Sequence, residues 1–253
     1  MPETLSTRQI VELFHMIFVR ALFSGLPDKR LIAIKGGINL RFFFHSVRFS
    51  EDLDLDVTTM AKATLENRID RLLQSPALIS PLKSRGVSIR EVSKPKQTET
   101  VQRWKLAIAT GSVEERTNIE FSRRDAVDRA KSEPIAALIA NAYDLPTFIA
   151  THYTCADAIL QKIQALAGRD ETQPRDVFDL HVLFARRDAP KKLDDDKSKL
   201  IAAAAKNAAD LSYERYLALV VAYLDPDHAD VYSSRDAWEA MQLEVIGRIE
   251  ALA

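Results

Sequence analysis

The hydrophobic positions in the first 150 residues alternate between two periods. Spacing of three and four residues, which is typical of helices, covers residues 6–23, 38–46 and 60–74. Strand-like stretches follow or separate these helices at residues 30–37, 52–57, 87–92, 100–109 and 116–122. Ser6 or Thr7 is a suitable N-cap for the first helix. Residues 132–139 and 146–150 fit either short strands or loops. The pattern predicts an α/β domain over residues 1–150.

After about residue 150 the pattern becomes helical throughout. The predicted helices cover residues 155–168, 174–186, 196–210, 212–224 and 235–253. Pro174 suits the first position of its helix, where the missing N–H costs nothing. We therefore expect a second, α-helical domain over residues 151–253.

Composition and charge narrow the class of protein. The 253 residues are 47% hydrophobic and 28% charged, with a net charge of −1, as expected of a globular protein with no general affinity for polyanions. Cys155 is the single cysteine, which excludes an intrachain disulfide. No signal peptide and no apolar run of membrane-spanning length are apparent, so we expect a cytoplasmic protein without membrane contact.

One segment is locally basic. Residues 83–131 contain 12 Lys and Arg against 7 Asp and Glu. Such a surplus is either an ordinary solvated surface or a side that faces a polyanion. Trp104, between Arg103 and Lys105, is either a strand residue of the core or a platform on which an RNA base stacks.

The stretch DLDLDV, residues 52–57, places three aspartates at alternate positions. Alternate residues of a strand share a face, so Asp52, Asp54 and Asp56 would lie together and repel one another unless a divalent cation relieved the repulsion. Mg²⁺ is a suitable cation because it prefers carboxylate oxygens. A calcium loop is excluded, since Val57 and Ala63 occupy the positions that such a loop requires to be Gly and Glu. An acidic edge strand that faces water remains the alternative.

Gly36-Gly37 follows the strand predicted at residues 30–37 and opens the next helix. Glycines at such a point let backbone N–H groups approach a phosphate, and the helix N-terminus adds partial positive charge. The chain has 7 glycines in all, so two in succession at this point are notable. A phosphate-binding turn followed by a metal-binding strand is what phosphoryl or nucleotidyl transfer requires.

The stretch IKGGINLRFFFHSVRFSEDLDLDV resembles the AbiEii/AbiGii family of nucleotidyltransferase-like toxins, which includes the MenT-type toxins. The family pattern is a strand ending in Gly-Gly, a short helix and R-x-S-x-D-x-D, matched by Arg48, Ser50, Asp52 and Asp54. A second block, KIQALAGRDETQPRDVFDL, is similar to the family segment K-x-x-A-L-x-x-R…R-D-x-x-D-L. Its matching residues are Lys162, Arg169, Arg175, Asp176 and Asp179.

The resemblance implies an α+β fold with a polymerase-beta-like nucleotidyltransferase core, a mixed sheet with flanking helices, followed by an α-helical C-terminal half. It implies that Asp52 and Asp54 hold the metals, two Mg²⁺, and that Gly36 and Gly37 bind the phosphates of an NTP. Lys162 and Asp176 would face the nucleotide from the helical domain, which completes the nucleotide cleft. Arg48 and Ser50 would brace the loop or contact phosphate.

A third metal ligand is expected on a neighbouring strand. Glu120 alternates with Ile119 and Phe121 and so points away from the core, whereas Glu114 and Glu115 have the character of turn residues. We therefore choose Glu120 as the third ligand and as a possible base. An exposed strand glutamate is the alternative. Near the second block, Arg175 and Asp179 are four apart and suited to pair with each other.

These observations lead to one main hypothesis and two alternatives. The main hypothesis is a toxin with a cognate antitoxin partner, which transfers a nucleotide from an NTP to an RNA 3′ end, tRNA by family resemblance. The first alternative keeps the site and changes the acceptor to a protein hydroxyl that is nucleotidylated or phosphorylated. The second is a binding module that retains nucleotide affinity without catalysis.

Overall fold

The computed structural model describes residues 5–123, 130–193 and 197–253. Part of the basic segment 83–131 and the first residue of the predicted helix 196–210 therefore lie outside the described residues. The chain divides into two compact units. Unit 1 comprises residues 1–43 and 49–153, and unit 2 comprises residues 44–48 and 154–253.

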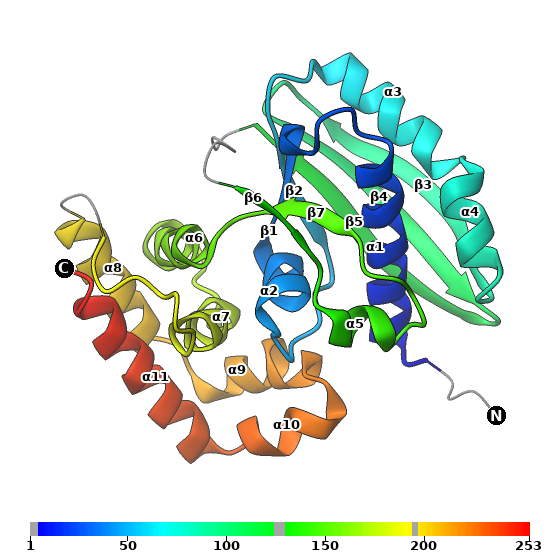
Figure 1. Ribbon diagram of the computed structural model, residues 1–253. Coiled ribbons are helices and arrows are strands. Elements are labelled where there is room, and N and C mark those ends of the chain that lie inside the picture. The colour runs from blue at the N-terminus through cyan, green and yellow to red at the C-terminus, as the bar shows by residue number, and fades with distance from the viewer. Residues whose placement is uncertain (1–4, 124–129, 194–196) are drawn as a thin grey trace. The chain divides into compact units, whose positions relative to one another are not determined.

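Unit 1 is built on a seven-stranded mixed sheet with the strand order β3-β4-β5-β2-β1-β7-β6 (Figure 1). β1 is antiparallel to β2 and parallel to β7, while β2 is parallel to β5. Antiparallel pairs β3–β4, β4–β5 and β6–β7 complete the sheet. The strands are β1 (Ile32–Lys35), β2 (Leu53–Val57), β3 (Val87–Gln97), β4 (Val101–Thr110), β5 (Val113–Ser122), β6 (Lys131–Pro134) and β7 (Ile149–His152).

The core of unit 1 lies between this sheet and α1 (Thr7–Ser24), with α3 (Lys62–Leu73) and α4 (Pro76–Lys83) beside it. Ser6 caps α1 through a capping box with Gln9, as its sequence predicts. Trp104 is fully buried and donates a hydrogen bond from Nε1 to Asp70 on α3 at 3.0 Å. Its buried position excludes stacking on an RNA base and makes it a residue of the core.

Two shorter helices belong to unit 1 as well. α2 (Gly36–Phe44) begins directly after β1, so Gly36-Gly37 does join a strand to a helix. The residues that sequence patterns leave unassigned form β6, α5 (Ala137–Asn141) and β7. α4 was not predicted from the sequence, because Pro81 in its interior interrupts the helical pattern.

Unit 2 is helical. Its elements are α6 (Cys155–Gly168), α7 (Pro174–Phe184), α8 (Ser198–Ala209), α9 (Tyr213–Leu219), α10 (Pro226–Tyr232) and α11 (Arg235–Glu250). α6 packs against α7 and α8, and α11 packs against α7 and α8. Cys155 is buried, as a core thiol. None of the helices in the described part of the chain is both long enough and apolar enough to cross a membrane.

Candidate active site

The aspartate-rich strand β2 lies in the middle of the sheet, between β1 and β5. Leu53 and Leu55 are fully buried behind it. Asp54 pairs with Lys35 of β1 on one side and with Glu120 of β5 on the other. The central position of β2 rules out an acidic edge strand, because both of its edges are hydrogen-bonded.

Gly36 leaves room for the Asp54 carboxylate. A Cβ built on Gly36 would lie 2.8 Å from Asp54 Oδ2, closer than real Cβ contacts come. Gly36 also has φ +66°, a conformation that favours glycine over any L side chain. Two separate constraints thus demand glycine at this position, and both bring the start of α2 against the second aspartate.

The three aspartates have different partners. Asp52 Oδ1 accepts hydrogen bonds from the Asn118 backbone N–H at 3.1 Å and from Asn118 Nδ2 at 2.8 Å. Asp56 is fully buried and forms an ion pair with Lys35 Nζ at 2.5 Å. The Tyr153 hydroxyl donates to the other oxygen of Asp56 at 2.7 Å. The partners of Asp56 are thus a lysine and a tyrosine of unit 1, as expected of a carboxylate that stabilises the fold.

Glu120 stands beside Asp54 in the strand register, and its side chain is 25% exposed. Arg103, the opposite residue on β4, donates from Nε to Glu120 Oε2 at 2.7 Å. Glu114 and Glu115 lie within β5 and pair with Ala109 and Ile108, so their interpretation as turn residues was wrong. The long β4–β5 hairpin places its turn at Gly111 instead.

The acidic residues of β2 and β5 suit a hard divalent cation, because every donor is an oxygen. In the described residues no three His, Cys, Asp or Glu side chains are already gathered as a metal centre. Arg103 contacts the Glu120 carboxylate and Asn118 contacts that of Asp52. The carboxylate oxygens of Asp52, Asp54 and Glu120 are of the chemical type that would suit a hard divalent cation.

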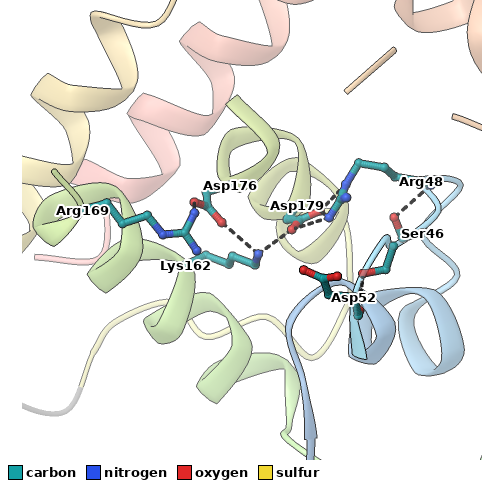
Figure 2. A network of polar contacts seen from close by, with 8 residues as sticks. Ser46, Arg48, Asp52, Lys162, Arg169, Asp176 and Asp179 are labelled. Carbon is teal, nitrogen blue, oxygen red and sulfur yellow. Dashed lines mark hydrogen bonds and ion pairs between the residues drawn. The ribbon is translucent and has the colours of Figure 1, made fainter. Parts of the chain in front are cut away.

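Unit 2 contains the second group of sequence-predicted residues, joined in one chain of alternating charges (Figure 2). Lys162 Nζ lies 2.9 Å from Asp176 Oδ1 and 2.6 Å from Asp179 Oδ2. Arg169 contacts the other oxygen of Asp176 at 2.6 Å. Arg48 donates to both oxygens of Asp179, from Nη2, at 2.9 and 3.0 Å. We refer to these five residues as the ionic chain.

The sequence explains why the ionic chain forms. Pro174 is the first residue of α7, so Asp176 lies in the first helical turn and Asp179 one turn later on the same side. Both aspartates are fully buried. The expected pair between Arg175 and Asp179 is wrong, because Asp179 instead contacts Arg48 and Lys162.

Burial and charge oppose each other at two members of the ionic chain. Burial would lower the pKa of Lys162, but Asp176 and Asp179 outweigh it and hold that pKa above its ordinary value. Burial would likewise raise the pKa of Asp179, but Arg48 and Lys162 outweigh it and hold the pKa below its ordinary value. Both groups are therefore charged at neutral pH, and the ionic chain has three cations against two carboxylates.

Some residues of these two groups escaped the sequence analysis. Lys35, Asn118, Tyr153 and Arg103 fix the carboxylates of unit 1, yet no role was expected of any of them from the sequence. Asn118 alternates with Glu120, which was a usable signal. Ser50 donates its hydroxyl to the Asp52 carbonyl at 2.9 Å, within the loop that precedes β2.

Comparisons with known proteins agree with this architecture. A candidate nucleotidyltransferase from Helicobacter pylori is 20% identical, with a TM-score of 0.61, covering 98% of this chain and 99% of that one. JHP933, also from Helicobacter pylori, is 20% identical with a TM-score of 0.59, covering 98% and 95%. MenT4, a nucleotidyltransferase toxin from Mycobacterium tuberculosis, is 18% identical with a TM-score of 0.58, covering 98% and 87%.

At these identities the three structures show a shared fold. No curated protein sequence matches the chain. A family model described as "Nucleotidyl transferase AbiEii toxin, Type IV TA system" matches residues 18–250. This match extends over nearly the whole sequence and includes both motif blocks, so the chain belongs to the AbiEii family of nucleotidyltransferase toxins of type IV toxin–antitoxin systems.

Proposed function

We propose that this toxin transfers a nucleotide from an NTP to the 3′ end of an RNA, with tRNA as the acceptor class, and depends on Mg²⁺. The observation that carries the proposal is the position of Asp54, which lies against the Gly36 turn and beside Glu120 in the strand register. A phosphate-binding backbone turn next to acidic oxygens is the minimum that metal-assisted nucleotidyl transfer needs.

In this proposal, Asp52, Asp54 and Glu120 would hold two Mg²⁺, which when bound would neutralise charge on the phosphate oxygens. The acceptor hydroxyl oxygen forms a bond to the α-phosphorus as the bond from that phosphorus to the bridging oxygen breaks, and pyrophosphate leaves. Glu120 accepts the hydroxyl proton on its carboxylate. The N–H groups at Gly36 and Gly37 donate to the phosphates.

Unit 2 supplies positive charge in this proposal. The ionic chain has one cation more than it has carboxylates, and its Lys162 is charged. Lysine binds a triphosphate as a compact point charge. Asp176 and Asp179 hold the Lys162 ammonium in one place, and Arg48 is a positioning residue that acts through Asp179. The proposal also includes a cognate antitoxin, which the family match supports, and a cytoplasmic location.

The test is a transfer assay with α-labelled NTPs, Mg²⁺ and total RNA, resolved on gels that separate RNA from protein. We expect the label at RNA 3′ ends, and we expect Asp52→Asn to abolish it. Label on protein alone would replace the RNA acceptor by a protein hydroxyl. An Asp52→Asn variant as active as the unmodified chain would overturn the site assignment.

A further inference from the structure

A recess of about 290 Å³ opens on unit 1 beside Asp52. It lies over β3, β4 and β5, which can be followed in Figure 1. Its lining includes Asp52, Glu91, Lys105, Ala107, Arg116 and Asn118. The recess therefore extends from Asp52, which directly precedes β2, along one face of the β4–β5 hairpin.

Two cations in this recess have no side-chain partner among the described residues. In residues 5–123, 130–193 and 197–253, neither Lys105 nor Arg116 forms an ion pair or a side-chain hydrogen bond, and both are exposed. Arg103, two residues earlier on β4, is in contrast paired with Glu120. Unpaired cations that line a concavity are available for an anion.

The strand register brings these two cations together. Lys105 pairs with Asn118 and Ala107 pairs with Arg116, so Lys105 and Arg116 are diagonal neighbours on one face. Diagonal neighbours lie roughly 7–8 Å apart, a distance that two long side chains can close around a single phosphate. Ala107, opposite Arg116 in the register, also lines the recess and has a short side chain.

The order of the strands indicates whether the recess lies on the side of the attacking oxygen or of the leaving oxygen. Gly36 follows β1, which flanks β2 on one side, whereas β5 and β4 lie on the other. In-line transfer at phosphorus puts the attacking and leaving oxygens on opposite sides. If the pyrophosphate leaves from the Gly36 side, the attacking hydroxyl approaches from the β5 side, where the recess opens. This step rests on the function proposed above.

The charges of the lining select among ligands. Glu51, Asp52 and Glu91 also line the recess and repel a polyanion such as a triphosphate. A terminal nucleotide of RNA fits better, because it presents one phosphodiester to the two cations and neutral ribose hydroxyls to the carboxylates. A protein hydroxyl has no phosphate for Lys105 and Arg116.

We propose that this recess is the acceptor subsite, in which Lys105 and Arg116 bind the phosphodiester preceding the 3′-terminal nucleotide of a single-stranded RNA end. The side chains are positioning residues and do not touch the reacting atoms. Their role is to direct the terminal hydroxyl toward Asp52 and its neighbours.

The test compares the doubly substituted Lys105→Gln/Arg116→Gln chain with a control that removes two exposed cations elsewhere, Lys83→Gln/Lys199→Gln. A third variant, Lys105→Arg/Arg116→Lys, keeps both charges. The readouts are the rate of labelling of a tRNA preparation, the KM for NTP, and the anisotropy of a fluorescein-labelled single-stranded RNA titrated with each protein.

We expect the Gln double variant to bind the RNA roughly tenfold to a hundredfold more weakly and to lose kcat/KM for RNA equally, with its KM for NTP unchanged. The salt dependence of its binding should fall by about 1.4 in log–log slope, as expected for two single-strand phosphate contacts. The control and the charge-keeping variant should match the unmodified chain.

Equal loss in the control, or RNA binding unaffected by the Gln substitutions, would overturn the acceptor subsite while leaving RNA labelling by the unmodified chain intact. Absence of RNA labelling by the unmodified chain would instead overturn the proposed function. Labelling of protein by a chain whose Gln variant is equally active would overturn both.

Discussion

The Oδ2 atom of Asp54 lies 2.8 Å from the position that a Cβ atom on Gly36 would occupy, which is too close for any residue but glycine. This contact couples the turn before α2 to the central strand of the sheet. The same residue, Gly36, adopts a positive φ, so two separate costs of substitution meet at one position.

Gly36→Ala therefore tests the coupling. Positive φ should cost roughly 1 kcal/mol of stability, and the Cβ should in addition displace the Asp54 carboxylate and lower the rate of transfer at least tenfold. Gly111→Ala is the matched control, because Gly111 has φ +55° and nothing within 4 Å of its Cβ position. Its unfolding free energy should fall similarly in urea titrations, with activity retained. Equal activity of the two variants would refute the coupling.

Of the alternating aspartates, we expect Asp54 to affect the rate of transfer and Asp56 to affect the stability of the fold. We expect Asp54→Asn to lower the rate about 10²–10³-fold, equivalent to several kcal/mol of lost charge stabilisation, with little change in Tm. Asp56→Asn should instead lower the free energy of unfolding by roughly 2–3 kcal/mol, because it breaks the pair with Lys35 at a fully buried position. Transfer assays and thermal melts of both variants check this. The reverse pattern would exchange the two roles.

Arg48 and Arg169 stand at the two ends of the ionic chain. We expect substitutions of these two residues to lower the free energy of unfolding by unequal amounts. Arg48→Met removes a bidentate partner from the buried Asp179 and should cost about 2–4 kcal/mol. Arg169→Met should cost about 1 kcal/mol or less, because Arg169 is 38% exposed and Asp176 keeps Lys162. Urea unfolding of the two variants measures the difference, and equal costs would contradict the arrangement.

His15 predicts a dependence of stability on pH. Thr117 donates its hydroxyl to the Glu51 carbonyl, so it accepts from His15 Nε2, and the buried Nδ1 has no partner in the described structure. Burial lowers the pKa of His15 to about 3. The unfolded chain binds a proton below the ordinary pKa of 6.5 while the folded chain does not, so stability falls as pH decreases from 6.5 toward 3.

At pH 4.5 this contribution amounts to a loss of about 3 kcal/mol relative to pH 7. His15→Gln, which can still donate to Thr117, should remove that loss and flatten the acid limb of the stability curve. Unfolding in urea at pH 7 and pH 4.5 gives the comparison. Burial also lowers the pKa of His152, to about 4. His152 is present in both chains, so its contribution to the pH dependence cancels in the comparison.

Local patterns were sufficient to predict much of unit 1 and of its candidate site. The alternation in residues 52–57 predicted β2, and Gly36-Gly37 predicted the turn into α2, because period and glycine freedom are properties of neighbouring residues. The partners of Glu120 and Asp179 were not predictable in this way. Arg103 reaches Glu120 through the β4–β5 register, and Arg48 reaches Asp179 across 131 residues of sequence.

Residues 44–48 belong to unit 2 although they lie between α2 and β2 of unit 1. The polypeptide therefore crosses between the units three times, and no single cut yields two autonomous folding pieces. A fragment that starts at residue 154 would lack Arg48 and bury Asp179 with half of its positive neighbours missing. During synthesis on the ribosome, the loop around Arg48 emerges long before α7, so Arg48 has no contact with Asp179 until α7 has been made. A chain truncated between these segments would leave Arg48 without Asp179, so we expect unit 2 to form only once α7 has been made.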